Sequence, residues 1–171
     1  MGKDKQEKTN VMRLLEQAGI QWKAHCYVNT GAVSGTDVAA ALGEDPAMTF
    51  KTLVTVGKPR QYYVFMIPVA CELDLKKAAS AVGEKSIAMI PQKDLLPLTG
   101  YIHGSCSPIG MKKQFRTIIH QSAETLPVFM FSAGKIGYQV EAEPKAIAGL
   151  IHADFVDCTL VNDVRPTNEN N

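Results

Sequence analysis

A lysine inside an apolar segment is the residue of this chain best placed to do chemistry. Lys51 lies in the run FKTLVTV at 50–56, whose aromatic and β-branched residues predict a β-strand. Side chains alternate between the two faces of a strand, so we expect Thr52 on the face of Phe50 and Lys51 on the other. Because removing water from an ammonium group is costly, a lysine here indicates either a strand end open to solvent or a pocket that takes an anionic group.

A glycine-rich loop, TGYIHGSCSPIG at 99–110, follows later in the chain. Glycine lets a ligand approach the backbone closely, so the loop supplies a contact surface that Lys51 alone cannot. The loop also holds Cys106 and His103, which could act as a nucleophile and its base. Such a pair needs a third group to orient it, and none is evident. We therefore favour a binding site formed by Lys51 and the loop backbone.

Composition and charge narrow the function classes. The 171 residues are 46% hydrophobic and 20% charged, which predicts one globular domain with a sizeable core. No apolar run approaches the roughly 18 residues that span a bilayer, and residues 1–8 do not resemble a secretory signal. Four dispersed cysteines favour a reduced, cytoplasmic protein without disulfides or a metal site. With a net charge of +1, a nucleic-acid substrate would be held weakly or at one end only.

Capping and turn signals predict alternating helices and strands. We expect helices at 10–18, 35–42, 73–82 and 144–150, and strands at 20–28, 50–56, 62–67, 86–90, 116–119, 128–132, 138–141 and 155–160. Local hairpins indicate an α+β domain with a mixed, mostly antiparallel sheet in a barrel-like core flanked by helices, not a doubly wound parallel sheet. The domain is expected to span 9–161, between polar tails at 1–8 and 162–171.

Four motifs occur in an order that is found in one family. They are FKTL at 50–53, LDLKK at 73–77, TGY with SPIG between 99 and 110, and SAGK at 132–135. With these motifs the chain resembles YbaK-type aminoacyl-tRNA deacylases, relatives of the editing domain inserted in bacterial prolyl-tRNA synthetases. The resemblance runs from about Thr9 to Leu160 and is closest to the cysteine-directed branch.

The resemblance implies an enzyme of the lyase or hydrolase class that removes cysteine from mischarged tRNA(Pro). Its substrate would be the aminoacylated 3′ end of tRNA, with prolyl-tRNA synthetase as a transient partner and no cofactor. In this branch the thiol of the substrate itself attacks the ester carbonyl, so that the enzyme folds the substrate into a reactive shape. Alternatives are an Ala-tRNA(Pro) deacylase and a non-catalytic module that binds tRNA ends or a synthetase. A thiol or redox enzyme built on Cys106 is a further class.

By resemblance, Lys51 contacts a terminal phosphate or the ester oxygen, and the amides of Gly104 and Ser105 flank the substrate carbonyl. Further substrate contacts implied by the family are Tyr27, Thr52, Cys106, Ser107, Pro108, Ser132, Gly134 and Gln139. Without the family, these residues would be read as ordinary strand and turn positions.

Three positions depart from the family pattern. His120 stands where relatives often carry an aspartate, and Gln139 stands where the cysteine-directed branch often has an acid. Cys106 occupies a position that is commonly aliphatic or small. These departures bear on the amino-acid preference and not on the fold. His25 and His152 are expected at the surface or at a strand edge.

Overall fold

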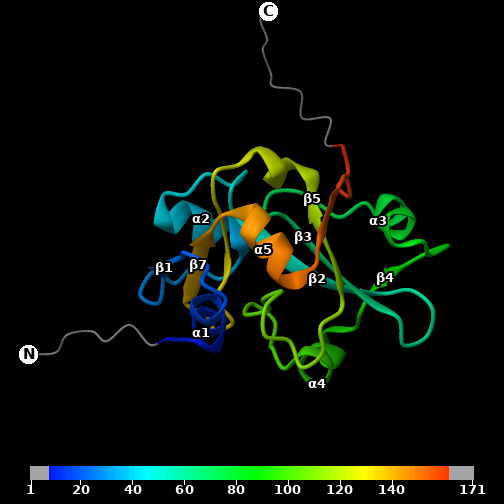
Figure 1. Cartoon of the computed structure of the whole chain (residues 1–171), viewed down its shortest axis with the longest axis horizontal. Helices are drawn as coiled ribbons and strands as arrows, with labels where there is room; N and C mark the ends of the chain where they lie inside the picture. The colour runs from blue at the N-terminus through cyan, green and yellow to red at the C-terminus, as the bar shows by residue number, and fades with distance from the viewer. Residues whose placement is uncertain (1–7, 162–171) are drawn as a thin grey trace, which may run out of the picture.

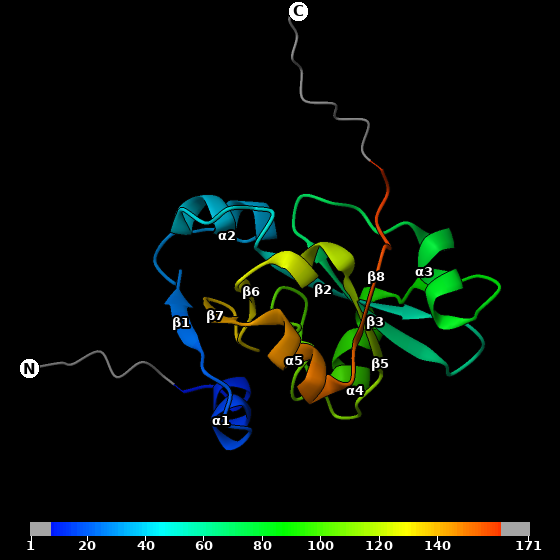
Figure 2. The same ribbon diagram turned by 45° about the horizontal axis from the view of Figure 1, so that its top comes forward.

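The structure, a computed structural model, describes residues 8–161, so the predicted tails lie outside the described residues apart from Lys8. Its strands form two sheets (Figures 1 and 2). The three-stranded sheet has the order β1-β7-β6, with strands Lys23–Cys26, Tyr138–Ala142 and Phe129–Ser132. The five-stranded sheet has the order β4-β2-β3-β5-β8, with strands Ala88–Met89, Phe50–Val56, Tyr62–Pro68, Arg116–His120 and Asp154–Val156.

Strand directions confirm the predicted α+β class with mixed pairing. The three-stranded sheet is antiparallel, and β2 pairs antiparallel with both of its neighbours, whereas β5 runs parallel to β3 and β8. The strands are divided between two sheets where one sheet was expected. The sheets meet at a bridge between Thr49 and Met130, where the Met130 amide donates a 2.8 Å hydrogen bond to the carbonyl of Met48.

The described helices are short, and α1, α2 and α3 begin at side-chain caps. They are α1 Asn10–Gln17, α2 Gly35–Leu42, α3 Leu75–Val82, α4 Leu95–Thr99 and α5 Pro144–Ile151, with 3-10 turns η1 Gln92–Asp94 and η2 Gln121–Thr125. Thr9, Ser34 and Asp74 accept hydrogen bonds from first-turn amides of α1, α2 and α3, as expected of N-cap residues. None of the helices within 8–161 is long and apolar enough to cross a membrane.

The main core lies between the two sheets. Phe50 of β2 packs edge-on against Phe129 of β6, with ring centroids 5.2 Å apart. Residues of α1 and α5 complete this cluster. Helix α5 is seen near the middle of the molecule in both views (Figures 1 and 2). A second cluster forms where α3 packs on β3 and β5 at the other end of the molecule. The five-stranded sheet is thereby held from both sides.

The structure differs from the prediction in several elements, and β4 is shorter than the strand expected at 86–90. The first strand is limited to Lys23–Cys26, because only these residues pair with β7. The last strand ends at Val156, beyond which the chain leaves β5 and Thr159 bridges to Leu73 beside α3. Helix α4, immediately before the glycine loop, was not predicted although Gly100 ends it in the left-handed conformation that often terminates helices.

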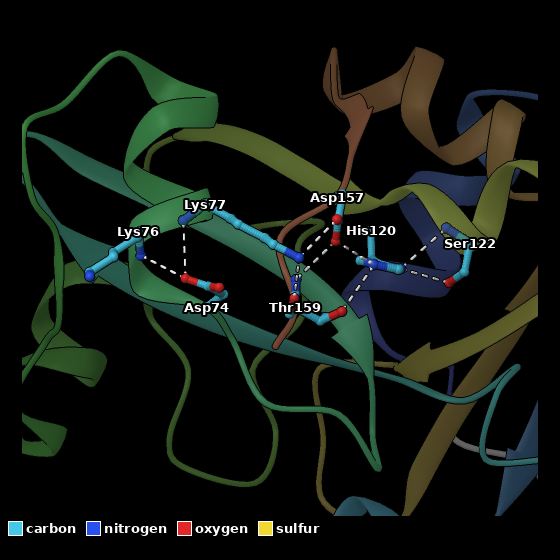
Figure 3. Close-up of polar contacts among 7 residues, drawn as sticks. All are labelled: Asp74, Lys76, Lys77, His120, Ser122, Asp157 and Thr159. Atoms are coloured by element: carbon cyan, nitrogen blue, oxygen red, sulfur yellow. Dashed lines mark hydrogen bonds and ion pairs between the residues drawn. The ribbon is translucent and has the colours of Figure 1, made fainter. Parts of the chain in front are cut away.

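A polar network ties the chain beyond β8 to α3 and β5 (Figure 3). Lys77 donates hydrogen bonds to the carboxylate of Asp157 at 2.9 Å and to the carbonyl of Thr159 at 3.0 Å. His120 contacts the same Asp157 carboxylate at 3.3 Å and the Ser122 hydroxyl at 2.9 Å. These contacts join elements that are distant in sequence, so the network holds the end of the described chain against the sheet.

Candidate active site

A cleft of about 650 Å³ lies along β2 and is the candidate site. This volume falls within the roughly 300–1,000 Å³ that small-molecule sites occupy. Its walls come from the segment 27–38, from β2, from the segment 89–95, from the glycine loop and from the β6–β7 hairpin. Segments from most of the domain therefore meet at one strand.

The cleft follows β2 because one edge of this strand is open. Strand β4 pairs only with Thr55 and Val56, and one further hydrogen bond of 3.2 Å runs from the Ile90 amide to the Val54 carbonyl. Before Val54 no strand covers this edge of β2 within the described chain. A cleft that surrounds a strand edge touches both faces, which explains why Lys51 and Thr52 both line it although their side chains alternate.

Thr52 presents unpaired polar groups at this edge. The Gly57 amide donates a 2.8 Å hydrogen bond to the Gln61 carbonyl, so Gly57 belongs to a hydrogen-bonded pair between β2 and β3. In an antiparallel ladder every second residue forms such a pair, which means that Lys51 and Leu53 also direct their amide and carbonyl groups toward β3. The amide and carbonyl of Thr52 consequently face the open edge. Its hydroxyl is buried and has no hydrogen-bond partner in the described part of the chain. Because buried polar groups are normally satisfied, the unpaired hydroxyl makes Thr52 a candidate contact for a ligand.

Lys51 determines the charge of the cleft. Among the described residues that line the cleft, Lys51 is the only lysine or arginine, and there is no aspartate or glutamate. Lys51 is half-buried beside the open edge, so water screens the attraction between its side chain and an anionic ligand less than it would in bulk solvent. The cleft therefore favours a phosphate or an oxygen that develops negative charge.

The glycine loop contributes His103, Gly104 and Cys106 to the lining of the cleft. Gly104 has φ +91°, a conformation that other residues rarely adopt, and this fixes the course of the loop. Burial raises the pKa of the Cys106 thiol to about 12, so this thiol is protonated at neutral pH. A protonated thiol is a poor nucleophile, which argues against Cys106 as the attacking group.

Four of the predicted contact residues lie behind the cleft wall. Ser105, Ser107, Pro108 and Gly134 are not among the residues that line it. Ser105 and Ser107 are buried, and a side chain at Gly134 would meet Tyr101 at 3.0 Å. Ser105, Ser107 and Pro108 thus support the glycine loop and Gly134 supports the β6–β7 hairpin, without lining the cleft.

Ser132 connects this supporting layer to the cleft that it lines. Its hydroxyl donates a 2.8 Å hydrogen bond to the Ser105 carbonyl and accepts one of 3.1 Å from the Gly134 amide. The β6–β7 hairpin thus holds the glycine loop at one point. Ser132 and Ser105 were both predicted as site residues, and this hydrogen bond joins them.

Tyr27 and Gln139 line the remaining wall, and both are almost completely buried. In the orientation of the Gln139 amide that satisfies both groups, its nitrogen donates to the Glu44 carboxylate, at 2.7 Å to one oxygen and 3.1 Å to the other. The Thr49 hydroxyl donates to the same carboxylate at 3.1 Å. Burial raises the pKa of Glu44 above its ordinary value, although the hydrogen bond from Thr49 and the nearby His25 oppose the rise.

Glu44 was missed by the sequence analysis. It lies between Gly43, which ends α2, and the Asp45-Pro46 turn, where a charged side chain is usually solvated. No spacing relates Glu44 to Gln139, so only tertiary structure reveals the pair.

The remaining departures and histidines lie elsewhere. His120 belongs to the network of Figure 3 and does not line the cleft. His25 lies on the edge strand β1, paired with Glu141 at 2.9 Å, and His152 is exposed at the end of α5. Among residues 8–161 no group of three or more His, Cys, Asp or Glu side chains is arranged to hold a metal ion.

Comparison with known proteins identifies the family. Residues 30–150 match the model of the aminoacyl-tRNA editing domain. The chain is 44% identical over 158 residues to EbsC of Enterococcus faecalis, which is named for Cys-tRNA(Pro)/Cys-tRNA(Cys) deacylase activity; the match covers 92% of this chain and 96% of EbsC.

Solved structures support the fold. One, described as a trans-editing enzyme for prolyl-tRNA synthetase, has a TM-score of 0.78 at 24% identity, covering 88% of this chain and 94% of that one. A hypothetical protein has a TM-score of 0.81 at 18% identity, covering 90% and 100%. At these identities the structural matches establish the architecture alone. With the family model spanning most of the chain and a close relative spanning nearly all of it, this protein belongs to the aminoacyl-tRNA editing domain family.

Proposed function

We propose that this protein is a trans-editing deacylase that removes cysteine from mischarged Cys-tRNA(Pro). The observation that carries the proposal is the placement of Lys51 beside the open edge of β2, in a cleft whose lining holds no carboxylate. An aminoacyl ester with an adjacent phosphate is the kind of ligand that this charge distribution favours. The name of its relative EbsC supports cysteine as the amino acid.

Lys51 and the backbone act on the reacting ester. The substrate thiol forms a bond to the ester carbonyl carbon, the bond from that carbon to the ribose oxygen breaks, and the thiol proton passes to the departing ribose hydroxyl. Negative charge develops on the carbonyl oxygen during this step, and preorganised donors at that position lower the barrier. Lys51 and the Gly104 amide are the donors that we assign to this oxygen, and Thr52 holds the aminoacyl group at the strand edge.

The entrance of the cleft suits the unpaired end of a nucleic acid. Val33 is 78% exposed and Met89 is 45% exposed, although both line the cleft. Exposed aliphatic side chains of this kind can make apolar contact with the face of a terminal base, and such contact does not depend on which base it is. Since the net charge is only +1, we assign the choice of tRNA to a transient complex with prolyl-tRNA synthetase, in the cytoplasm.

The test is deacylation of Cys-tRNA(Pro), Ala-tRNA(Pro) and Pro-tRNA(Pro) by purified protein. We expect cysteine release with proline spared, and a loss of at least about a hundredfold in kcat/KM for Lys51→Ala. Lys76→Ala, at an exposed lysine of α3, is the matched control and should behave as wild type. Faster loss of alanine would reassign the substrate. No turnover of any of the three, even with the synthetase added, would leave a binding module as the function.

A further inference from the structure

The cleft contains a polar pair for which the proposed reaction has so far no use. Gln139 lines the cleft, and Glu44, which does not line it, lies behind it. In the orientation of the Gln139 amide that satisfies both groups, its nitrogen donates to both oxygens of Glu44. The two ends of a carboxamide differ, because the nitrogen only donates and the oxygen only accepts. With the nitrogen facing Glu44, the carbonyl oxygen is the end of the group left for a ligand in the cleft.

The Glu44 carboxylate is itself held in place. Thr49 is almost fully buried and donates its hydroxyl to Glu44 at 3.1 Å and also to the carbonyl of Asp45 at the same distance. The segment that carries Glu44 is thus anchored at the start of β2. Gln139, in turn, is fixed in register opposite His25 on β1. Both partners are therefore preorganised before any ligand enters.

The charges near this wall are unequal. The nearby His25 contacts the carboxylate of Glu141 at 2.9 Å, whereas the carboxylate of Glu44 is held by the neutral donors Thr49 and Gln139. The Glu44 carboxylate consequently makes the cleft negative near Gln139 on β7, whereas Lys51 makes it positive along β2. A ligand that carries both a cation and an anionic oxygen matches this polarity.

We propose that Glu44 is a positioning residue that orients the Gln139 amide, so that the Gln139 carbonyl oxygen binds the α-ammonium of the aminoacyl ester. The inference rests on the proposed deacylase function. An α-ammonium is a strong hydrogen-bond donor, and the carboxylate behind the amide polarises the amide toward it. The same contact turns the ester carbonyl toward Lys51 and the glycine loop, which is the arrangement that the reaction requires.

The test compares Cys-tRNA(Pro) with 3-mercaptopropionyl-tRNA(Pro), which keeps the thiol and lacks the ammonium. Wild type should favour the cysteinyl ester. Glu44→Gln, which keeps the shape and removes the charge, should lower kcat/KM for Cys-tRNA(Pro) by about tenfold and change that for the desamino ester by less than about twofold. Glu84→Gln is the matched control, since Glu84 is also half-buried and accepts a 2.6 Å hydrogen bond from a neutral donor, the hydroxyl of Tyr63.

A double-mutant cycle separates positioning from a general structural role. If Glu44 acts through Gln139, adding Glu44→Gln to Gln139→Met should lower kcat/KM no further, whereas independent effects would add. Thermal unfolding of each variant checks that it is folded. Equal losses on the two esters, or additive losses in the cycle, would overturn the inference while the deacylase function stands. A wild type inactive on Cys-tRNA(Pro) would instead overturn the proposed function and this inference with it.

Discussion

The hydroxyl of Ser132 lies 2.8 Å from the carbonyl oxygen of Ser105 and joins the β6–β7 hairpin to the glycine loop. The same hydroxyl accepts a hydrogen bond from Gly134, so it satisfies two backbone groups on different segments. Through this contact the position of Gly104 in the cleft depends on a residue that is remote in sequence. Loop and hairpin are therefore expected to act as one unit.

Ser132→Ala should both destabilise the protein and slow deacylation. The substitution leaves the Ser105 carbonyl and the Gly134 amide without this partner, which we expect to lower the free energy of unfolding by ~2 kcal/mol. Urea unfolding measures that loss, and single-turnover deacylation measures the rate. Ser80→Ala, at an exposed position of α3, is the control. Unchanged deacylation in a destabilised Ser132→Ala would show that the loop keeps its position without this contact.

Thr52→Val should change stability and activity in opposite directions. The Thr52 hydroxyl is buried without a partner, so replacing it with a methyl group should raise the free energy of unfolding by ~1 kcal/mol. Deacylation should fall, because the ligand loses a contact at the open edge.

Thr55→Val is the matched control on the same strand. The Thr55 hydroxyl is buried but donates a 3.0 Å hydrogen bond to the Tyr63 carbonyl, so its removal should lower the free energy of unfolding by ~1 kcal/mol. Thr55 does not line the cleft, and deacylation should stay near wild type. The Thr52 prediction fails if Thr52→Val is as destabilising as Thr55→Val.

Cys106→Ala should remain active. With its pKa raised to about 12 by burial, the Cys106 thiol is not ionised at neutral pH, and the attacking thiol is supplied by the substrate. Alkylation with iodoacetamide at pH 7 should label the exposed Cys26 before Cys106, as mass spectrometry of the peptides can show. An inactive Cys106→Ala beside an active Lys51→Ala would point to a cysteine nucleophile instead.

Asp157 should make stability depend on acid pH. The hydrogen bond from Lys77 lowers the pKa of this carboxyl below its ordinary value of 3.8. A carboxyl with a lower pKa in the folded state stabilises the fold above its unfolded pKa, and this contribution is lost as the pH falls through the folded pKa. The difference in unfolding free energy between wild type and Asp157→Asn should therefore be constant near neutral pH and shrink below about pH 4.

Asp154→Asn provides the comparison, since Asp154 is exposed on β8 of the same segment. The Lys77–Asp157 pair is partly open to solvent, so added salt should reduce the Asp157→Asn effect. A difference that persists unchanged down to pH 2 would mean that Asp157 contributes through packing and not through its charge.

Local signals were sufficient for much of the fold. The N-cap Ser34 acts within the next three residues, and the hairpin around Gly57 is decided by a short turn, so the start of α2 and this hairpin could both be predicted. The strand containing Lys51 could be predicted for the same reason, because composition and alternation are properties of a few neighbouring residues.

The ends of elements depend on partners that are remote in sequence. The first strand stops at Cys26 because β7 offers no further pairing, and the last stops at Val156 because the chain is drawn toward α3. Neither partner can be identified from the local sequence. The residues at which helices and strands end are for this reason harder to predict from sequence than the presence of the helices and strands.

The sequence by itself determined which residues could do chemistry: a lysine in a strand, a glycine loop and a family pattern. Tertiary structure decided which of them face a ligand. It left the edge of β2 open at Thr52, buried Ser105 and Ser107 outside the lining of the cleft, half-buried Cys106 and placed Glu44 behind Gln139. The physical reason is that burial, charge and hydrogen-bond satisfaction arise from contacts between distant segments, whereas capping, turns and alternation arise within a few residues.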